Sequence, residues 1–216
     1  MPSLPLGIGR RERLARSRLY VVSDARQGKG DLETFLDAIL AAGVDIVQLR
    51  EKEAEAGDLL KWGQVFREAA ARHGALFVVN DRPDVAVALG ADGVHLGQND
   101  LPVDLTRRLV GLELIVGLST HGEDQLRAAS GQADYVCVGP VHETPTKPGR
   151  LAVGLELVRV AASRERRPWF AIGGIDPANL SAVVDAGARR IVVVRAVTSS
   201  EDPAAAVRRL LAGLPG

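Results

Sequence analysis

The chain has 216 residues, of which 46% are hydrophobic, so it can bury a sizeable core. Its 27 Lys and Arg residues balance 27 Asp and Glu residues, which argues against nucleic-acid or anionic-membrane partners because these usually require a basic excess. One cysteine, Cys137, cannot form an internal disulfide. No apolar stretch approaches the roughly 18 residues that span a bilayer, and the N-terminal apolar region is too short for a secretory signal. We therefore expect a soluble cytoplasmic protein.

Short runs rich in Val, Ile and Leu alternate with longer helical patterns along the chain. Residues 1–18, with several arginines around Leu14, are expected to form an extra helix or a tail. The runs expected to form strands are Leu19–Ser23, Asp45–Leu49, Leu76–Asn80, Gly93–Leu96, Leu114–Gly117, Tyr135–Gly139, Trp169–Ile172 and Arg190–Val194. The segments expected to form helices are Leu32–Ala42, Ala56–His73, Pro83–Leu89, Asp104–Val110, Gly122–Ala129, Leu155–Ser163, Pro177–Ala186 and Pro203–Ala212.

The repeated order of strand and helix requires parallel strands joined by right-handed crossovers. Eight units predict a closed (β/α)8 barrel of the TIM type, with an open doubly wound sheet as the alternative. The barrel is favoured because no Gly-rich dinucleotide turn follows the first strand and polar residues follow many strands rather than one switch point. No linker divides the chain, so we expect a single α/β barrel domain over residues 19–216 after the segment 1–18.

Polar residues after the second strand predict an anion site. In a barrel, the residues that leave the C-terminal ends of the strands surround the active site. The stretch Q48-L-R-E-K52 alternates so that Gln48, Arg50 and Lys52 point the same way. Arginine suits bidentate contact with phosphate. A solvated strand end is the alternative.

Two acidic residues follow the third and fourth strands, Asp81 in N80-D-R-P-D84 and Asp100 in H95-L-G-Q-N-D100. Adjacent parallel strands bring their ends together, so both carboxylates could hold Mg²⁺, which binds one or two carboxylates plus substrate phosphate oxygens. Turn formation or helix capping is the alternative for the first stretch.

The loops after the later strands predict a second anion site. Thr144, Thr146 and Lys147 lie between prolines after the sixth strand, and glycines at 173 and 174 follow the seventh. Glycines before a helix let backbone N–H groups approach a phosphate, and the loops after strands seven and eight often form such a site. Ser119 is expected to face the mouth, whereas Cys137 is too deep to act as a nucleophile, so acyl transfer has little support. The mouth therefore indicates two phosphorylated ligands, one a metal-bound diphosphate.

Taken in order, these motifs resemble those of thiamine phosphate synthase from about Leu19 to the last helix. They are Q48-L-R-E-K, N80-D-R, G93-V-H-L-G-Q-N-D, G117-L-S-T-H, G139-P-V-H-E-T-P-T-K, A171-I-G-G-I and V192-V-V-R-A-V. The resemblance implies a Mg²⁺-dependent transferase of thiamine biosynthesis. Such an enzyme joins 4-amino-5-hydroxymethyl-2-methylpyrimidine diphosphate to a thiazole phosphate, with or without a carboxylate, and releases pyrophosphate.

The resemblance also implies roles for the matching positions. The pyrimidine diphosphate would be bound within the set Gln48, Leu49, Arg50, Glu51, Lys52, Asn80, Ser119 and Lys147. The thiazole phosphate would be bound by Thr144, Pro145, Thr146, Gly173, Val194 and Arg195. The expected catalytic residues are Arg50, Lys52, Ser119 and Lys147, with one Mg²⁺ per active site on Asp81 and Asp100. Many members of the family carry Ser where this chain has Arg195.

Three other functions are alternatives for this sequence. A thiazole tautomerase on the same barrel would not need Lys147 or the aspartate pair. A non-catalytic barrel that binds a phosphorylated ligand would have no reason to keep Asp81 and Asp100. An unrelated sugar-phosphate enzyme would need an acid–base pair at the mouth, which the sequence does not show. The expected partners are small molecules, and homo-oligomer formation is left open.

Overall fold

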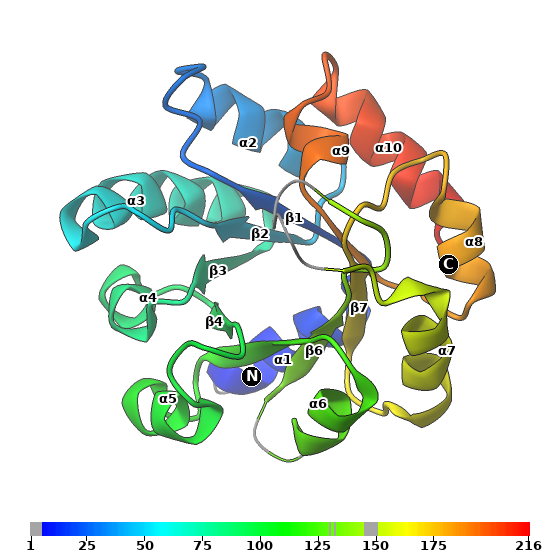
Figure 1. The fold of residues 1–216 in the computed structure, drawn as a ribbon. Coiled ribbons are helices and arrows are strands. Elements are labelled where there is room, and N and C mark those ends of the chain that lie inside the picture. Colours follow the sequence, from blue (N-terminus) through cyan, green and yellow to red (C-terminus); the bar gives the residue numbers. More distant parts are fainter. Residues whose placement is uncertain (1–5, 130, 132, 145–150) are drawn as a thin grey trace, which may run out of the picture.

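The computed structural model describes residues 6–129, 131, 133–144 and 151–216. Eight parallel strands close into a barrel in sequence order, and β8 pairs with β1. The strands are β1 Leu19–Ser23, β2 Ile46–Leu49, β3 Leu76–Asn80, β4 Gly93–Leu96, β5 Ile115–Thr120, β6 Tyr135–Val138, β7 Trp169–Ile172 and β8 Ile191–Val193. The predicted single-domain (β/α)8 barrel is therefore confirmed, and the open sheet is excluded (Figure 1).

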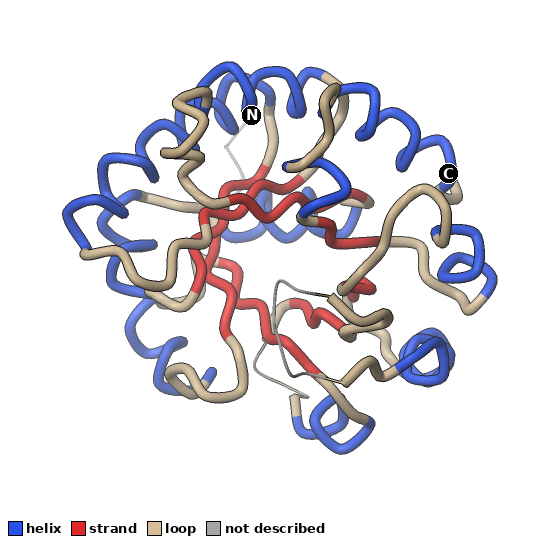
Figure 2. Tube along the Cα trace, turned by 45° about the horizontal axis from the view of Figure 1, so that its top comes forward, coloured by secondary structure: helices blue, strands red, loops and turns tan. Residues whose placement is uncertain are grey.

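Helices surround the strands on the outside, as Figure 2 shows. They are α1 Leu6–Arg16, α2 Leu32–Ala41, α3 Ala56–His73, α4 Pro83–Leu89, α5 Val103–Val110, α6 Glu123–Ala128, α7 Gly154–Arg164, α8 Leu180–Asp185, α9 Arg195–Thr198 and α10 Pro203–Gly213. Across the described ranges, none of these helices has both the length and the apolar character needed to cross a bilayer.

Side chains alternate between two apolar layers, because successive residues of a strand point to opposite faces. On β1, Val21 packs in the layer between barrel and helices, whereas Tyr20 and Val22 belong to a separate cluster inside the barrel. The buried members of the interior cluster are Leu14, Tyr20, Val22, Ile46, Leu76, Val78, Ile115, Tyr135, Cys137, Phe170 and Val192. Side chains thus fill the barrel up to the level of the mouth.

The N-terminal segment forms helix α1, which closes the base of the barrel. Leu14 is only 2% exposed and packs into the interior cluster. Asp92, just before β4, accepts a bond of 2.9 Å from Arg10 Nε. Asp134, just before β6, accepts one of 2.8 Å from Arg11 Nε. These ion pairs join the helix to the N-terminal ends of the strands, opposite the mouth.

Strand β5 is longer than expected. The prediction ended it at Gly117, but pairing with β6 continues as far as Thr120. A Cβ atom at Gly117 would lie 2.1 Å from the ring of Tyr135. Glycine therefore occupies the middle of this strand because a tyrosine fills its side-chain space, and it does not end the strand.

The segments after β7 and β8 also differ from the prediction. Helix α8 begins at Leu180 and not at Pro177, because Asp176 and Asn179 hold the intervening residues in a turn. The expected strand Arg190–Val194 ends at Val193, and the short helix α9 follows it.

Candidate active site

Two adjoining cavities open at the C-terminal ends of the strands. The glycine pocket has a volume of about 330 Å³ and is lined by Thr144, Ile172, Gly173, Gly174, Ile175, Asp176, Val192, Val193, Val194, Arg195, Ala196 and Ser199. The aspartate pocket has a volume of about 80 Å³ and is lined by Tyr20, Val22, Gln48, Arg50, Lys52, Asn80, Asp81, His95, Gly97, Asp100, Ser119, Cys137, Ile172, Val192 and Val194. Both pockets are lined by Ile172, Val192 and Val194, so these three apolar side chains form a wall between them.

The aspartate pocket collects most of the residues predicted for the diphosphate and the metal. These are Gln48, Arg50, Lys52, Asn80, Asp81, Asp100 and Ser119. Leu49 and Glu51 are not among its lining residues. Leu49 is 1% exposed and packs in the outer layer, and a Glu51 carboxylate oxygen accepts a bond of 2.8 Å from the Ala25 N–H. Alternation along this segment explains both positions.

The two predicted metal ligands lie together. Both line the aspartate pocket, and each carboxyl group shifts the pKa of the other. Asp81 has a φ of 59°, in the left-handed region that Asp tolerates better than most residues, and its N–H donates to the His95 carbonyl at 2.8 Å. The Gly97 N–H donates to Asp100 Oδ2 at 2.6 Å. Lys52 Nζ lies 3.4 Å from Asp81 Oδ2.

The pKa values of the pair move in opposite directions. Burial raises the pKa of Asp81, and the hydrogen bond and charge of Asp100 raise it further against the opposing effect of Lys52. Burial also acts to raise the pKa of Asp100, but the bonds from Asp81 and the Gly97 N–H outweigh it and hold that pKa below its ordinary value. Without a cation, Asp81 therefore keeps its proton to a higher pH than Asp100 does.

This donor set fits Mg²⁺. Within the described part of the chain, no group of three or more His, Cys, Asp or Glu side chains could enclose a metal ion. Magnesium does not need such a cage, because it keeps several waters and binds one or two carboxylates together with substrate phosphates.

A buried chain of hydrogen bonds lies beneath the aspartate pocket. The Gln48 amide nitrogen donates to the Tyr20 hydroxyl, which lies 3.1 Å from the Tyr135 hydroxyl. His95 Nδ1 lies 3.0 Å from the Tyr135 hydroxyl, and His95 Nε2 lies 2.9 Å from Ser119 Oγ. Burial raises the pKa of both tyrosines, so both hydroxyls stay neutral.

His95 is 6% exposed and therefore lies in the core. Sequence reasoning missed Tyr20 and Tyr135. The available signal was alternation, since Tyr20 stands two residues before Val22 and Tyr135 two before Cys137, on the inward side of β1 and β6.

The glycine pocket has a tightly fitted backbone. Gly173 and Gly174 have φ values of 105° and 64°. Added Cβ atoms would lie 2.5 Å from Pro140 Cα and 2.7 Å from His142 Cβ. The Asn179 side chain donates to the Gly174 carbonyl at 2.8 Å and accepts from the Asp176 N–H at 3.0 Å. The loop is therefore fixed by its own side chains and not by the start of a helix.

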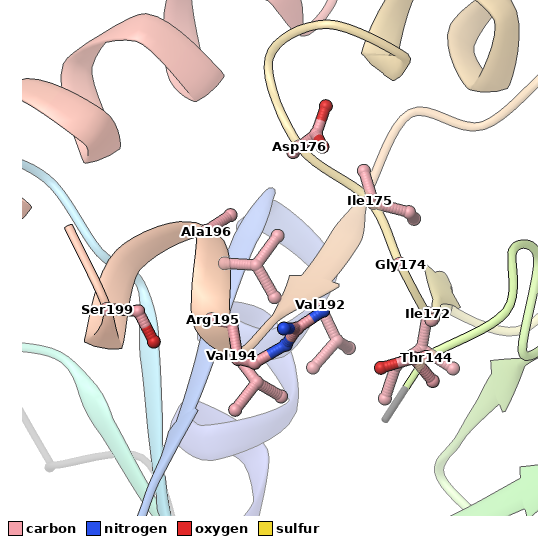
Figure 3. A pocket seen from close by; sticks show the side chains of 12 residues that line it. Thr144, Ile172, Gly174, Ile175, Asp176, Val192, Val194, Arg195, Ala196 and Ser199 are labelled. Atoms are coloured by element: carbon pink, nitrogen blue, oxygen red, sulfur yellow. The ribbon is translucent and has the colours of Figure 1, made fainter. Parts of the chain in front are cut away.

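The predicted thiazole-phosphate residues divide into two groups. Thr144, Gly173, Val194 and Arg195 all line the glycine pocket. In Figure 3, the Arg195 side chain extends from the start of α9 toward the side of the pocket that carries Thr144. Pro145, Thr146 and Lys147 lie outside the described residues.

Known proteins share both the sequence and this architecture. A family model described as thiamine monophosphate synthase matches residues 19–197. The chain is 57% identical over 199 residues to a thiamine-phosphate synthase of Streptomyces avermitilis, covering 91% of this chain and 93% of that protein. It is 54% identical over 214 residues to a thiamine-phosphate synthase of Mycobacterium bovis, covering 94% and 96% of the two chains.

A solved structure agrees. The thiamine phosphate pyrophosphorylase from Pyrococcus furiosus superposes with a TM-score of 0.82 at 32% identity, covering 94% of this chain and 96% of that chain. The chain therefore belongs to the thiamine monophosphate synthase family.

Proposed function

We propose that the protein joins 4-amino-5-hydroxymethyl-2-methylpyrimidine diphosphate to a thiazole phosphate, giving thiamine phosphate and pyrophosphate. One observation carries this proposal beyond family membership. Two pockets meet at an apolar wall, and of the two, the aspartate pocket holds a carboxylate pair together with Arg50 and Lys52. Two phosphorylated substrates, of which one brings a diphosphate, match this arrangement.

The chemistry needs charge stabilisation and alignment more than proton transfer. The carbon–oxygen bond to diphosphate breaks with its electron pair on the leaving oxygen, and the electron-rich aminopyrimidine supports the positive charge left on carbon. The thiazole nitrogen then donates its lone pair to that carbon, so no enzymic base is needed. Arg50 and Lys52 stabilise the departing charge, and loss of one such contact is expected to cost about 10²–10³-fold in rate, as for an oxyanion-hole donor.

Asp81 and Asp100 would hold the Mg²⁺ ion. When bound, the ion neutralises negative charge on the diphosphate as it leaves. Without it, Lys52 Nζ, 3.4 Å from Asp81 Oδ2, offsets part of the negative charge of the pair. The lysine therefore has access to both the carboxylate pair and the proposed diphosphate site.

The glycine pocket would hold the thiazole phosphate. Gly173 and Val194 contribute backbone there, and Thr144 contributes a hydroxyl. Arg195 stands where many family members carry Ser, and its guanidinium would add a charge contact to the phosphate. Pro145, Thr146 and Lys147 belong to the proposal on sequence alone.

The assignment is tested by measuring pyrophosphate with each substrate alone and with both together, with and without Mg²⁺. Release is expected only when both substrates and Mg²⁺ are present. Thiazole isomerisation is followed in parallel, because isomerisation without pyrophosphate would support the tautomerase alternative. Absence of pyrophosphate under all conditions would refute the synthase assignment.

Variants test the residues. Lys52→Ala is expected to lower kcat by about 10²-fold. Lys61→Ala is the matched control, because Lys61 is an exposed residue of α3 paired with Asp58, away from the pocket. Lys147→Ala should likewise lower turnover, and unchanged turnover would remove Lys147 from the site.

A cytoplasmic location and homo-oligomer formation stay predictions.

A further inference from the structure

The hydrogen-bond chain beneath the aspartate pocket connects two residues that line the pocket. We call Tyr20, Tyr135 and His95 the relay, because they connect Gln48 of β2 to Ser119 of β5. The relay residues are 0%, 0% and 6% exposed, in that order. Unsatisfied polar groups at this depth are costly, so each hydroxyl hydrogen is expected to be used within the chain.

The direction starts at Gln48, whose amide nitrogen donates to the Tyr20 hydroxyl and cannot accept. Tyr20 therefore directs its own hydrogen to its other neighbour, Tyr135. Tyr135 in turn directs its hydrogen to His95 Nδ1. With Nδ1 as the acceptor, a neutral imidazole carries its hydrogen on Nε2 and donates it to Ser119 Oγ.

The two ends of the relay consequently present opposite groups to the pocket. Ser119 Oγ already accepts from His95, so its hydroxyl hydrogen remains for a ligand. Gln48 donates through its amide nitrogen, so its carbonyl oxygen remains as an acceptor. Both residues line the aspartate pocket. An aminopyrimidine edge has the complementary pattern, with an amino group that donates beside a ring nitrogen that accepts.

We propose that Tyr20, Tyr135 and His95 are positioning residues that set Ser119 as a donor and Gln48 as an acceptor, and so select a pyrimidine with an amino group beside an unprotonated ring nitrogen. This inference rests on the proposed function for the identity of the substrate. The 4-oxo analogue of the pyrimidine diphosphate reverses the pattern, because it has a carbonyl oxygen beside a ring N–H. Both ends of the relay are therefore mismatched with the analogue. The Ser119 hydroxyl would face a ring N–H, and the Gln48 carbonyl oxygen would face another carbonyl oxygen.

The test measures the dissociation constants of the 4-amino and 4-oxo pyrimidine diphosphates by titration calorimetry with Mg²⁺. Because this reads binding, it does not depend on turnover, and a failure of the synthase assay does not decide it. Wild-type protein is expected to prefer the amino compound by at least about 10²-fold, since mismatched buried polar groups are strongly penalised.

Tyr135→Phe removes the central hydroxyl and keeps the ring. The preference for the amino compound is expected to fall by about 10-fold or more, while the dissociation constant of the thiazole phosphate stays unchanged. Thr120→Val is the matched control. Thr120 is a buried neighbour of Ser119 on β5 whose hydroxyl donates to the Cys137 carbonyl at 3.1 Å, outside the relay. It should alter thermal stability without altering the preference.

Tyr20→Phe is measured in the same way and decides the question if Tyr135→Phe does not fold by circular dichroism. A reduced amino preference in the folded tyrosine variant, with Thr120→Val unaffected, supports the relay. An unchanged preference in a folded tyrosine variant, or a wild-type protein that binds both pyrimidines equally, overturns it.

Discussion

Replacing Gly174 with alanine tests whether the glycine pocket needs its close backbone fit. Gly174 has a φ of 64°, and a Cβ there would lie 2.7 Å from His142 Cβ and 2.9 Å from the Glu143 carbonyl oxygen. Gly30 also has a φ of 64°, but nothing lies within 4 Å of its added Cβ. The pair Gly174→Ala and Gly30→Ala therefore separates the crowding from the backbone strain that both share.

The strain of placing alanine in the left-handed region is about 1–2 kcal/mol. For a chain of this size it should lower Tm by about 2–8 °C in both variants. The crowding adds a displacement at Gly174, because ordinary carbon contacts begin near 3.5 Å and the loops must separate by about 1 Å. Both loops border the glycine pocket, and a 1 Å misplacement can cost about 10²-fold in rate.

Steady-state kinetics with each substrate varied in turn provide the assay, with thermal melts to confirm folding. Gly174→Ala should raise KM for the thiazole phosphate and lower kcat/KM by about 10²-fold, whereas Gly30→Ala should change Tm alone. If a folded Gly174→Ala variant keeps the wild-type KM for the thiazole phosphate, the pocket does not bind that substrate through this loop.

Two further predictions concern the aspartate pair and the base of the barrel. Burial and Asp100 raise the folded-state pKa of Asp81. In metal-free wild-type protein, protonation of this carboxyl group therefore stabilises the fold fully below pH 3.8, its ordinary pKa, and this stabilisation is lost as the pH rises through the raised pKa. The Tm of wild type relative to Asp81→Asn should therefore fall across that window, and a difference independent of pH would contradict the raised pKa of Asp81. Asp134→Ala removes the partner of Arg11, of Arg107 at 2.6 Å and of the Val116 N–H at 2.8 Å. It should cost about 2–3 kcal/mol of unfolding free energy with little change in kcat, because these groups are largely buried but lie opposite the mouth. Chemical denaturation measures this, and a loss below about 0.5 kcal/mol, the range of ordinary surface substitutions, would show that the ion pairs do not secure α1.

The barrel could be predicted because the sequence pattern of each strand is local and recurs along the chain. Each strand is a short apolar run, and polar residues at the strand ends lie at one mouth whenever the strands are parallel. This logic brought Arg50, Asp81 and Asp100 together without tertiary information, and all three line one pocket.

The remaining features depend on contacts between distant residues. Gly117 resembles a strand end in the sequence, and only the ring of Tyr135 explains why it lies inside β5. Asp176 and Asn179 postpone the start of α8 through side-chain bonds to the loop backbone. Leu49 was expected to contact substrate as part of a motif. The alternation of side chains along β2 instead places the Leu49 side chain in the outer layer.

The wall of Ile172, Val192 and Val194 between the two pockets has a chemical consequence for the proposed reaction. A carbon that loses diphosphate becomes a strong electrophile and reacts with any lone pair within reach. These three side chains contain only carbon and hydrogen, so the surface that separates the substrates cannot be alkylated and does not bind water tightly. Chemical inertness at this boundary would keep the side chains between the substrates from competing with the thiazole nitrogen for that carbon.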